Sequence, residues 1–118
     1  MNKLYYLSSC NTCTRIIKEL NLPETFVLQD IKTEPITASQ IKEMRDLTDS
    51  YESLFSKRAQ LYKKLGLKDK SLTEEDYKNY ILEHYTFLKR PVIIYNEQIF
   101  IGNSKKTVDA AKLAIHEK

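Results

Sequence analysis

The sequence predicts one α/β domain, an α+β sandwich in which a helical insertion separates a βαβα half from a ββα half. Three observations indicate this class. Short apolar runs near both ends of the chain have strand composition, stretches with apolar residues at helical spacing separate them, and no strand pattern occurs between residues 51 and 88. Because 118 residues can bury one core but not two, we expect a single domain over residues 1–118, with the insertion at about 50–88.

The N-terminal part predicts a strand, a helix and a second strand. Lys3–Leu7 is short, aromatic and apolar like a buried strand, and the polar loop Ser8–Thr12 follows it. The next segment has apolar residues at helical spacing: Ile16, Ile17 and Leu20. Thr25–Ile31 has the β-branched and aromatic bias of a strand, and the intervening helix makes this strand parallel to the first one.

The middle of the chain predicts only helices. Thr37 and Gln40 have the spacing of a capping box. The helix that follows them has one apolar face, made of Ile41, Met44 and Leu47. A further helix is marked by Leu54, Leu61 and Leu65. Ser71 and Glu74 also have capping-box spacing, and they open a helix that carries Tyr77, Ile81, Tyr85 and Leu88. We assign the tyrosines of this part to packing.

The C-terminal part predicts a hairpin and a closing helix. Two apolar runs, Val92–Tyr95 and Gln98–Ile101, flank Asn96-Glu97 as in a tight antiparallel hairpin. Ser104–His116 follows as a helix with three inward residues: Val108, Ala111 and Ile115. Strand, helix and strand, followed later by a hairpin and a helix, form the thioredoxin-like layout, and a C-x-x-C motif at the first strand–helix junction is typical of it.

Cys10 and Cys13 form this motif and are the two cysteines of the chain. A structural zinc site needs four ligands, whereas the other candidates by type, His84 and His116, are single and distant in sequence. We therefore expect no metal site and two solvated histidines. Packing as a small buried hydrophobe is the alternative use of a cysteine, and it suits Cys13 better than Cys10, which lies in a polar loop.

The position of Cys10 favours thiol chemistry. Unpaired N–H groups at a helix start, together with the helix dipole, stabilise a thiolate and lower the thiol's pKa, so Cys10 is the candidate nucleophile. Cys13, one turn further along, can resolve an oxidised or adducted Cys10 by forming a disulfide with it. The same helix start, at Asn11 and Thr12, can also seat an oxyanion on its backbone amides.

Charge and composition indicate the class of protein, its expected location and the residues suited to bind an oxyanion. The net charge of +3 comes from basic residues interleaved with sixteen acids, which argues against a dedicated nucleic-acid-binding protein. The first seven residues resemble neither a signal peptide nor a membrane span, so we expect a cytoplasmic protein. Against fifteen lysines there are four arginines, of which Arg58 and Arg90 directly follow a lysine. Arginine offers a planar fork for oxyanions that lysine lacks.

Three segments together resemble the thioredoxin-like arsenate reductase (ArsC) and Spx family, over nearly the whole chain. They are "CNTCTRIIKEL", "LFSKRAQLYKKLGL" and "FLKRPVIIYNEQIFIG". The resemblance implies that Cys10 is the reactive cysteine and that Arg58 and Arg90 assist oxyanion binding and thiolate stabilisation. It also implies that Pro91 is the family's cis-proline opposite the cysteine loop.

The resemblance leaves two functions open. In the glutathione-coupled arsenate reductases an arginine follows the glycine of the last strand, whereas Asn103 follows Gly102 here, and the C-x-x-C motif is the Spx-like arrangement. The leading prediction is a monomeric cytoplasmic thiol-dependent oxidoreductase acting on a small oxyanion or disulfide. It would bind no cofactor and draw electrons from glutathione and glutaredoxin or from thioredoxin. The alternative is an Spx-like redox-sensing regulator that binds a protein partner of the RNA polymerase type without reducing arsenate.

Overall fold

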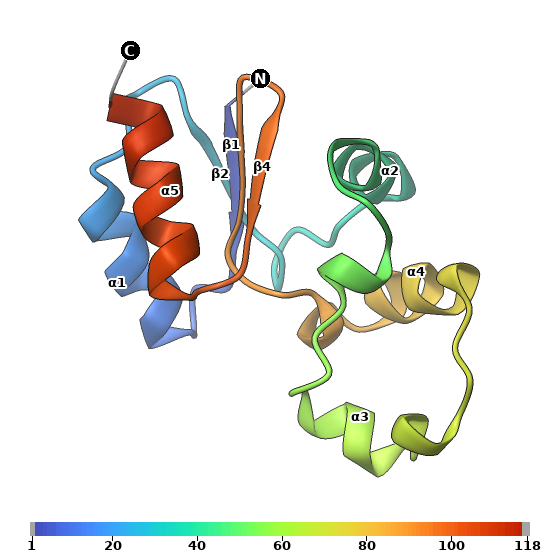
Figure 1. Cartoon of the computed structure of the whole chain (residues 1–118). Helices are drawn as coiled ribbons and strands as arrows, with labels where there is room; N and C mark the ends of the chain where they lie inside the picture. Colours follow the sequence, from blue (N-terminus) through green and yellow to red (C-terminus); the bar gives the residue numbers. More distant parts are fainter. Residues whose placement is uncertain (1, 117–118) are drawn as a thin grey trace. The chain divides into compact units, whose positions relative to one another are not determined.

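The computed structural model describes residues 2–116 and confirms the predicted α/β class. The chain divides into two compact units (Figure 1). The first unit combines the residues up to Glu34 with those from Arg90 onward, and the second is Pro35–Lys89. The second unit thus begins earlier than the insertion expected at about 50–88, because it includes the helix that follows Pro35.

A mixed four-stranded sheet of order β2-β1-β3-β4 forms the centre of the first unit. Its strands are β1 (Lys3–Tyr6), β2 (Val27–Asp30), β3 (Val92–Tyr95) and β4 (Gln98–Ile101). β1 pairs with β2 in parallel, as predicted, and with β3 antiparallel. The predicted hairpin is confirmed: β3 and β4 pair antiparallel, and both turn residues, Asn96 and Glu97, have positive φ angles (46° and 67°), as in a type I′ turn.

Two helices, α1 (Asn11–Leu20) and α5 (Lys105–His116), lie side by side on one face of this sheet (Figure 1). Both are amphipathic, and each turns its apolar stripe toward the strands. Their contact builds a core cluster from one residue of β1, two of α1, one of β3 and three of α5: Leu4, Ile16, Leu20, Ile93, Val108, Ala111 and Ile115. The inward residues predicted for the closing helix are therefore confirmed.

The strand directions bring four chain segments to one end of the sheet. Tyr5 pairs with Val92 in the antiparallel β1–β3 ladder, so the residues after β1 lie opposite those before β3. Tyr6 pairs with Asp30 in the parallel β1–β2 ladder, so the end of β2 lies at the same place. The Gly102 N–H donates to the Pro91 carbonyl at 2.9 Å, which adds the end of β4.

The second unit consists of helices around an aromatic cluster. Its helices are α2 (Ala38–Leu47), η1 (Glu52–Leu54), α3 (Gln60–Lys64), η2 (Leu67–Asp69), α4 (Glu74–Glu83) and η3 (Tyr85–Phe87), where η marks a 3₁₀ turn. Phe55 is buried at the centre of the cluster and stacks on Phe87 with 4.9 Å between ring centroids. Three of the four tyrosines assigned to packing surround Phe55, namely Tyr62, Tyr77 and Tyr80, whereas the fourth, Tyr85, is exposed.

One helix start in this unit is as predicted, and the next is not. Thr37 and Gln40 form a complete capping box before α2. The box at α4 uses Thr73 and Asp76, so the prediction of Ser71 with Glu74 is wrong. The reason is tertiary: the two carboxylate oxygens of Glu74 accept the backbone N–H groups of Tyr51 at 2.6 Å and of Glu52 at 3.2 Å.

The helix expected over Leu54–Leu65 is broken, because Phe55 forms an isolated antiparallel bridge with Leu88. The Ser56 N–H donates to the Phe87 carbonyl and the Lys89 N–H to the Leu54 carbonyl, at 2.6 and 2.9 Å. These bonds hold the chain extended where the leucine spacing predicted a helix. For the same reason α4 ends at Glu83, and the expectation that it carries Tyr85 and Leu88 is wrong.

Both histidines are exposed, as expected, but each also has a contact that the sequence does not predict. A ring nitrogen of His116, Nε2, lies 2.6 Å from the carbonyl oxygen of Leu20, so the end of α5 is tied to the end of α1. The ring of His84 meets Phe87 edge-on at 5.8 Å. No helix within residues 2–116 is long and apolar enough to cross a membrane.

The packing of α5 can be tested with two of its own residues. Ile115 is 4% exposed and Leu113 is 56% exposed. We expect Ile115→Ala to lower the free energy of unfolding by about 2 to 5 kcal/mol, because it leaves a cavity in the core cluster. Leu113→Ala, the matched control, should change it by less than about 0.5 kcal/mol. Equal losses in urea unfolding would contradict the assigned inward face.

Candidate functional site

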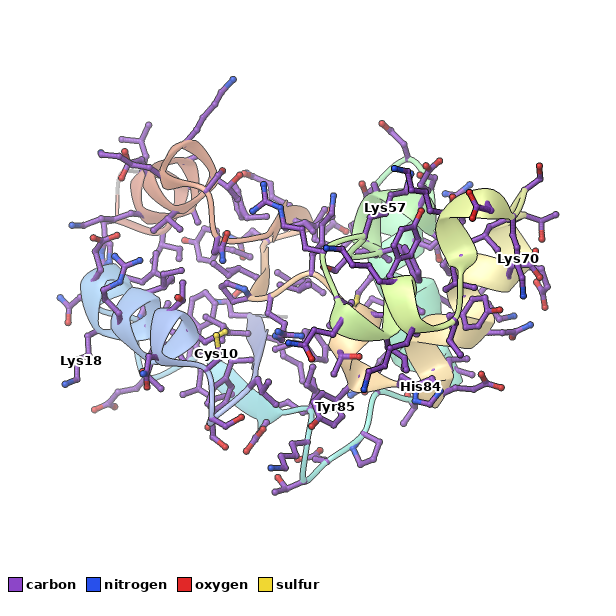
Figure 2. The ribbon with its side chains drawn as sticks, turned by 90° about the horizontal axis from the view of Figure 1, so that it is seen from below. Cys10, Lys18, Lys57, Lys70, His84 and Tyr85 are labelled. Carbon is purple, nitrogen blue, oxygen red and sulfur yellow. The ribbon has the colours of Figure 1, made fainter. Side chains whose placement is uncertain are left out.

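Cys10 is the N-cap residue of α1 at the end of the sheet where the four segments meet. Its N–H donates to the Leu7 carbonyl at 2.9 Å, and its own carbonyl accepts the Thr14 N–H at 3.2 Å. Figure 2 shows the Cys10 side chain at the start of α1, with Lys18 near the opposite end. The first turn of α1 contains no acidic residue, so the positive end of the helix dipole acts on the thiol.

The surroundings of Cys10 favour its thiolate. Partial burial, the largest single influence, raises the pKa of Cys10. It is outweighed by the influence of the Cys13 backbone N–H and the Cys13 thiol, the positive charge of Arg90 and the Thr12 backbone N–H, all of which lower the pKa. The net result is a pKa below the ordinary thiol value, because donors and a cation stabilise the charged form.

The pKa of Cys13 is shifted in the opposite direction. It is 1% exposed, and burial raises its pKa to about 11 despite a hydrogen bond from the Leu7 backbone. The hydrogen bond to Cys10 and the charge of Cys10 raise the pKa of Cys13 further. Cys13 is therefore a protonated, buried thiol that donates to Cys10. Both cysteines carry free thiols in this structure.

Arg90 and Pro91 precede β3 and therefore lie at the same end of the sheet as the cysteine loop. The Arg90–Pro91 peptide bond is cis. Arg90 is half-buried, and its guanidinium acts to lower the pKa of both Cys10 and Cys13. The first unit thus brings together a thiol with a lowered pKa, a second, buried thiol and the positive charge of Arg90.

The other predicted site residues differ in their contributions. Thr12 acts through its backbone N–H, which lowers the pKa of Cys10. The Asn11 side chain is exposed, and its carbonyl accepts the Thr14 hydroxyl at 3.0 Å. Arg58 belongs to the second unit, where it is exposed in the turn before α3. Its neighbour Lys57 forms an ion pair with Glu52 at 2.7 Å.

The sequence analysis missed one polar residue beside the cysteine loop. Asp30, the last residue of β2, accepts the Ser8 N–H at 3.3 Å and the Lys32 N–H at 3.2 Å through the same carboxylate oxygen. The signal was available: an acidic residue at the end of a strand parallel to β1 must lie near the loop that follows β1. Within residues 2–116, no group of three or more His, Cys, Asp or Glu side chains could hold a metal ion.

Comparison with known proteins adds family information to this geometry. The sequence model of the ArsC family matches residues 5–111. The chain is 29% identical over 112 residues to the global transcriptional regulator Spx of Bacillus subtilis (strain 168), covering 92% of this chain and 84% of Spx. It is 27% identical over 112 residues to the Spx regulator of Staphylococcus aureus (strain Mu50), with the same coverage.

A solved structure supports the same fold. The arsenate reductase from Vibrio cholerae superposes with a TM-score of 0.72 at 18% identity, covering 97% of this chain and 96% of that one. At this identity the likeness concerns the fold, and it confirms the thioredoxin-like architecture expected from the order of the elements.

The influence of Arg90 on the thiolate can be tested by alkylation of Cys10 with iodoacetamide as a function of pH, with each site read by mass spectrometry. In the native protein the profile should inflect below the ordinary thiol value of 9.0. Arg90→Gln removes a positive charge, so the pKa of Cys10 should rise and the rate at neutral pH should fall, while the rate at high pH stays the same. Cys13, with a pKa of about 11, should stay unmodified at neutral pH.

Arg15→Gln is the matched control, since it removes an exposed arginine from α1 of the same unit. Its profile should follow that of the native protein. A profile of Arg90→Gln that coincides with the native one would contradict a role for Arg90 in stabilising the thiolate.

Proposed function

Because this chain belongs to the ArsC family, we propose that it is a thiol-dependent oxidoreductase of the arsenate reductase type, with the Cys10 thiolate as its nucleophile. The observation that carries the proposal is the unequal pair of thiols. The pKa of Cys10 is lowered at the start of α1, while the pKa of Cys13 is raised to about 11 by burial. One thiol is prepared to attack, and the other is held protonated until it is needed.

In the first step, the Cys10 thiolate attacks the arsenic of arsenate. A sulfur–arsenic bond forms and one oxygen leaves as water, taking its protons from solvent, so arsenic stays in the +5 state. Arg90 supplies the positive charge that draws the oxyanion to Cys10. In this proposal the backbone amides of Asn11 and Thr12 at the helix start help to seat the oxyanion.

In the second step, Cys13 attacks the sulfur of Cys10. The sulfur–sulfur bond forms, the sulfur–arsenic bond breaks and its electron pair stays on arsenic, which leaves as arsenite. Once Cys10 is bonded to arsenic, it no longer carries the charge that raises the pKa of Cys13. Cys13 therefore loses its proton to solvent more readily after the first step than before it, which orders the two steps.

The Cys10–Cys13 disulfide must then be reduced by an outside dithiol. Glutathione with glutaredoxin, or thioredoxin, can supply the two electrons by thiol–disulfide exchange. This cycle suits a cytoplasmic protein, since the cytoplasm keeps such thiols reduced. Both thiols and the Arg90 charge belong to the same chain, so a monomer contains the groups that the proposed cycle uses.

Single-turnover reduction of arsenate by the fully reduced protein tests the proposal. We expect one arsenite per protein and a mass loss of two hydrogens. Cys10→Ser should lower the rate roughly a thousandfold or more, because it removes the nucleophile. Cys13→Ser should stop at the Cys10 adduct, and added glutathione should release arsenite from it. Undiminished turnover by Cys10→Ser would rule out the proposed chemistry.

A second candidate function is an Spx-like redox switch that binds a protein partner of the RNA polymerase type. The 29% identity to Spx over 112 residues favours it. Exposed basic residues of the second unit also favour it, and Figure 2 labels two of them, Lys57 and Lys70. The exposed basic residues between positions 57 and 70 are Lys57, Arg58, Lys63, Lys64, Lys68 and Lys70. Within residues 2–116, Lys57 is the member of this set that forms an ion pair, so this basic segment suits an acidic partner.

Capture of purified bacterial RNA polymerase by the immobilised oxidised and reduced proteins tests this alternative. We expect stronger capture in one redox state, and loss of capture when Lys63 and Lys64 are both replaced by Glu. Lys105→Glu, a charge reversal on α5 of the first unit, is the control and should leave capture unchanged. Equal capture in both redox states would exclude a switch.

A further inference from the structure

Asp30 is the last residue of β2, and its side chain is hydrogen-bonded to the loop that carries Cys10. Its carboxylate oxygen Oδ1 accepts the Ser8 N–H at 3.3 Å. The Ser8 side chain is the main reason that the pKa of this carboxyl is lowered, so the group is ionised at neutral pH. Ser8 stands two residues before Cys10, and its backbone N–H is bound by this one side chain.

The position of Asp30 is itself held from several sides. The β1–β2 ladder pairs Asp30 with Tyr6, and the Ile31 N–H donates to the Tyr6 carbonyl at 2.9 Å. The Asp30 carbonyl accepts the Glu34 N–H at 2.8 Å, and Oδ1 also accepts the Lys32 N–H at 3.2 Å. The carboxylate therefore belongs to a rigid strand end, from which it reaches across to the neighbouring loop.

The loop on the other side is short. The chain leaves β1 at Tyr6, and by Cys10 it has turned into α1, with the Cys10 N–H donating to the Leu7 carbonyl at 2.9 Å. The exposed residues Ser8 and Ser9 form this turn. A fixed Ser8 limits the orientations that Cys10 can take relative to the amides of Thr12 and Cys13, which stabilise its thiolate.

We propose that Asp30 is a positioning residue for Cys10: by accepting the Ser8 N–H, it fixes the turn that presents the thiol to the amides at the start of α1. The inference rests on the proposed function, because it takes Cys10 as the reactive thiol. It extends that function by adding a residue from β2 that acts on Cys10 through another residue.

Position and charge make opposite contributions here, which allows them to be separated. A carboxylate close to a thiol disfavours the thiolate, so removing the charge alone would raise the reactivity of Cys10. Removing the anchor of Ser8 would lower it, because the thiol would no longer be held against its hydrogen-bond donors. The sign of the change therefore identifies which property of Asp30 matters.

The experiment measures alkylation of Cys10 by iodoacetamide against pH in the full-length protein and in three variants of Asp30. Asp30→Ala removes both the acceptor and the charge. Asp30→Asn keeps an oxygen acceptor without the charge, and Asp30→Glu keeps the charge but displaces the acceptor by one methylene. Asp109→Ala is the control, since Asp109 is an acidic residue of the same unit that pairs with Lys105 within α5. Urea unfolding of each variant reports its stability.

We expect Asp30→Ala to slow alkylation at pH 7 by about three- to tenfold, equivalent to a rise of the Cys10 pKa by about half to one unit. The rate at high pH should be unchanged. Asp30→Asn, which keeps an acceptor without the charge, should be equal to the native rate or up to about twofold faster, whereas Asp30→Glu should be slowed despite keeping the charge. Asp109→Ala should match the native profile.

The inference is overturned if Asp30→Ala and Asp30→Glu both follow the native pH profile, or if Asp30→Ala and Asp30→Asn are both faster than the native protein. If Asp30→Ala does not fold, Asp30→Glu and Asp30→Asn decide between position and charge. The native profile checks the proposed function separately. An inflection at the ordinary thiol value in the native protein would overturn that function and the inference together.

Discussion

The antiparallel pairing of β1 with β3 at the centre of the sheet is the constraint on which the site depends. Because Tyr5 lies opposite Val92, the loop that leaves β1 and the segment that enters β3 must meet at one end of the sheet. The first carries Cys10 and the second carries Arg90, residues that stand eighty positions apart in the sequence. The parallel partner β2 ends at the same place with Asp30, so three strand ends bring Cys10, Arg90 and Asp30 to one end of the sheet.

The start of α1 then divides the two thiols into different roles. A helix N-terminus offers N–H groups that have no partner within the helix, and Cys10 occupies the capping position where they converge. Cys13 lies one turn later on the buried face, against the sheet, where loss of hydration opposes its ionisation. The C-x-x-C spacing thus places one cysteine at the polar end of the helix and the other in its apolar stripe.

Sequence patterns predicted elements well where local forces decide them. The Thr37–Gln40 capping box and the Asn96-Glu97 turn involve neighbouring residues alone, and both form as expected. Prediction failed where a residue distant in the sequence binds the groups that the local pattern would have used. Glu74 suits a capping box with Ser71, but it binds the backbone of Tyr51 and Glu52 instead. The leucine spacing around Phe55 suits a helix, but pairing with Leu88 and burial among aromatic rings hold Phe55 extended.

The sequence by itself determined the class of fold, the order of strands and helices in the first unit, and the place of the cysteine pair at the start of α1, because each depends on short-range spacing and on a C-x-x-C motif at a strand–helix junction. Only the tertiary structure decided which groups surround Cys10. Hydrogen bonds and charges act over a few ångströms in space, and strand pairing alone determines which distant segments come that close. The charge of Arg90 acting on Cys10, the burial of Cys13 and the contact between Ser8 and Asp30 follow from that pairing.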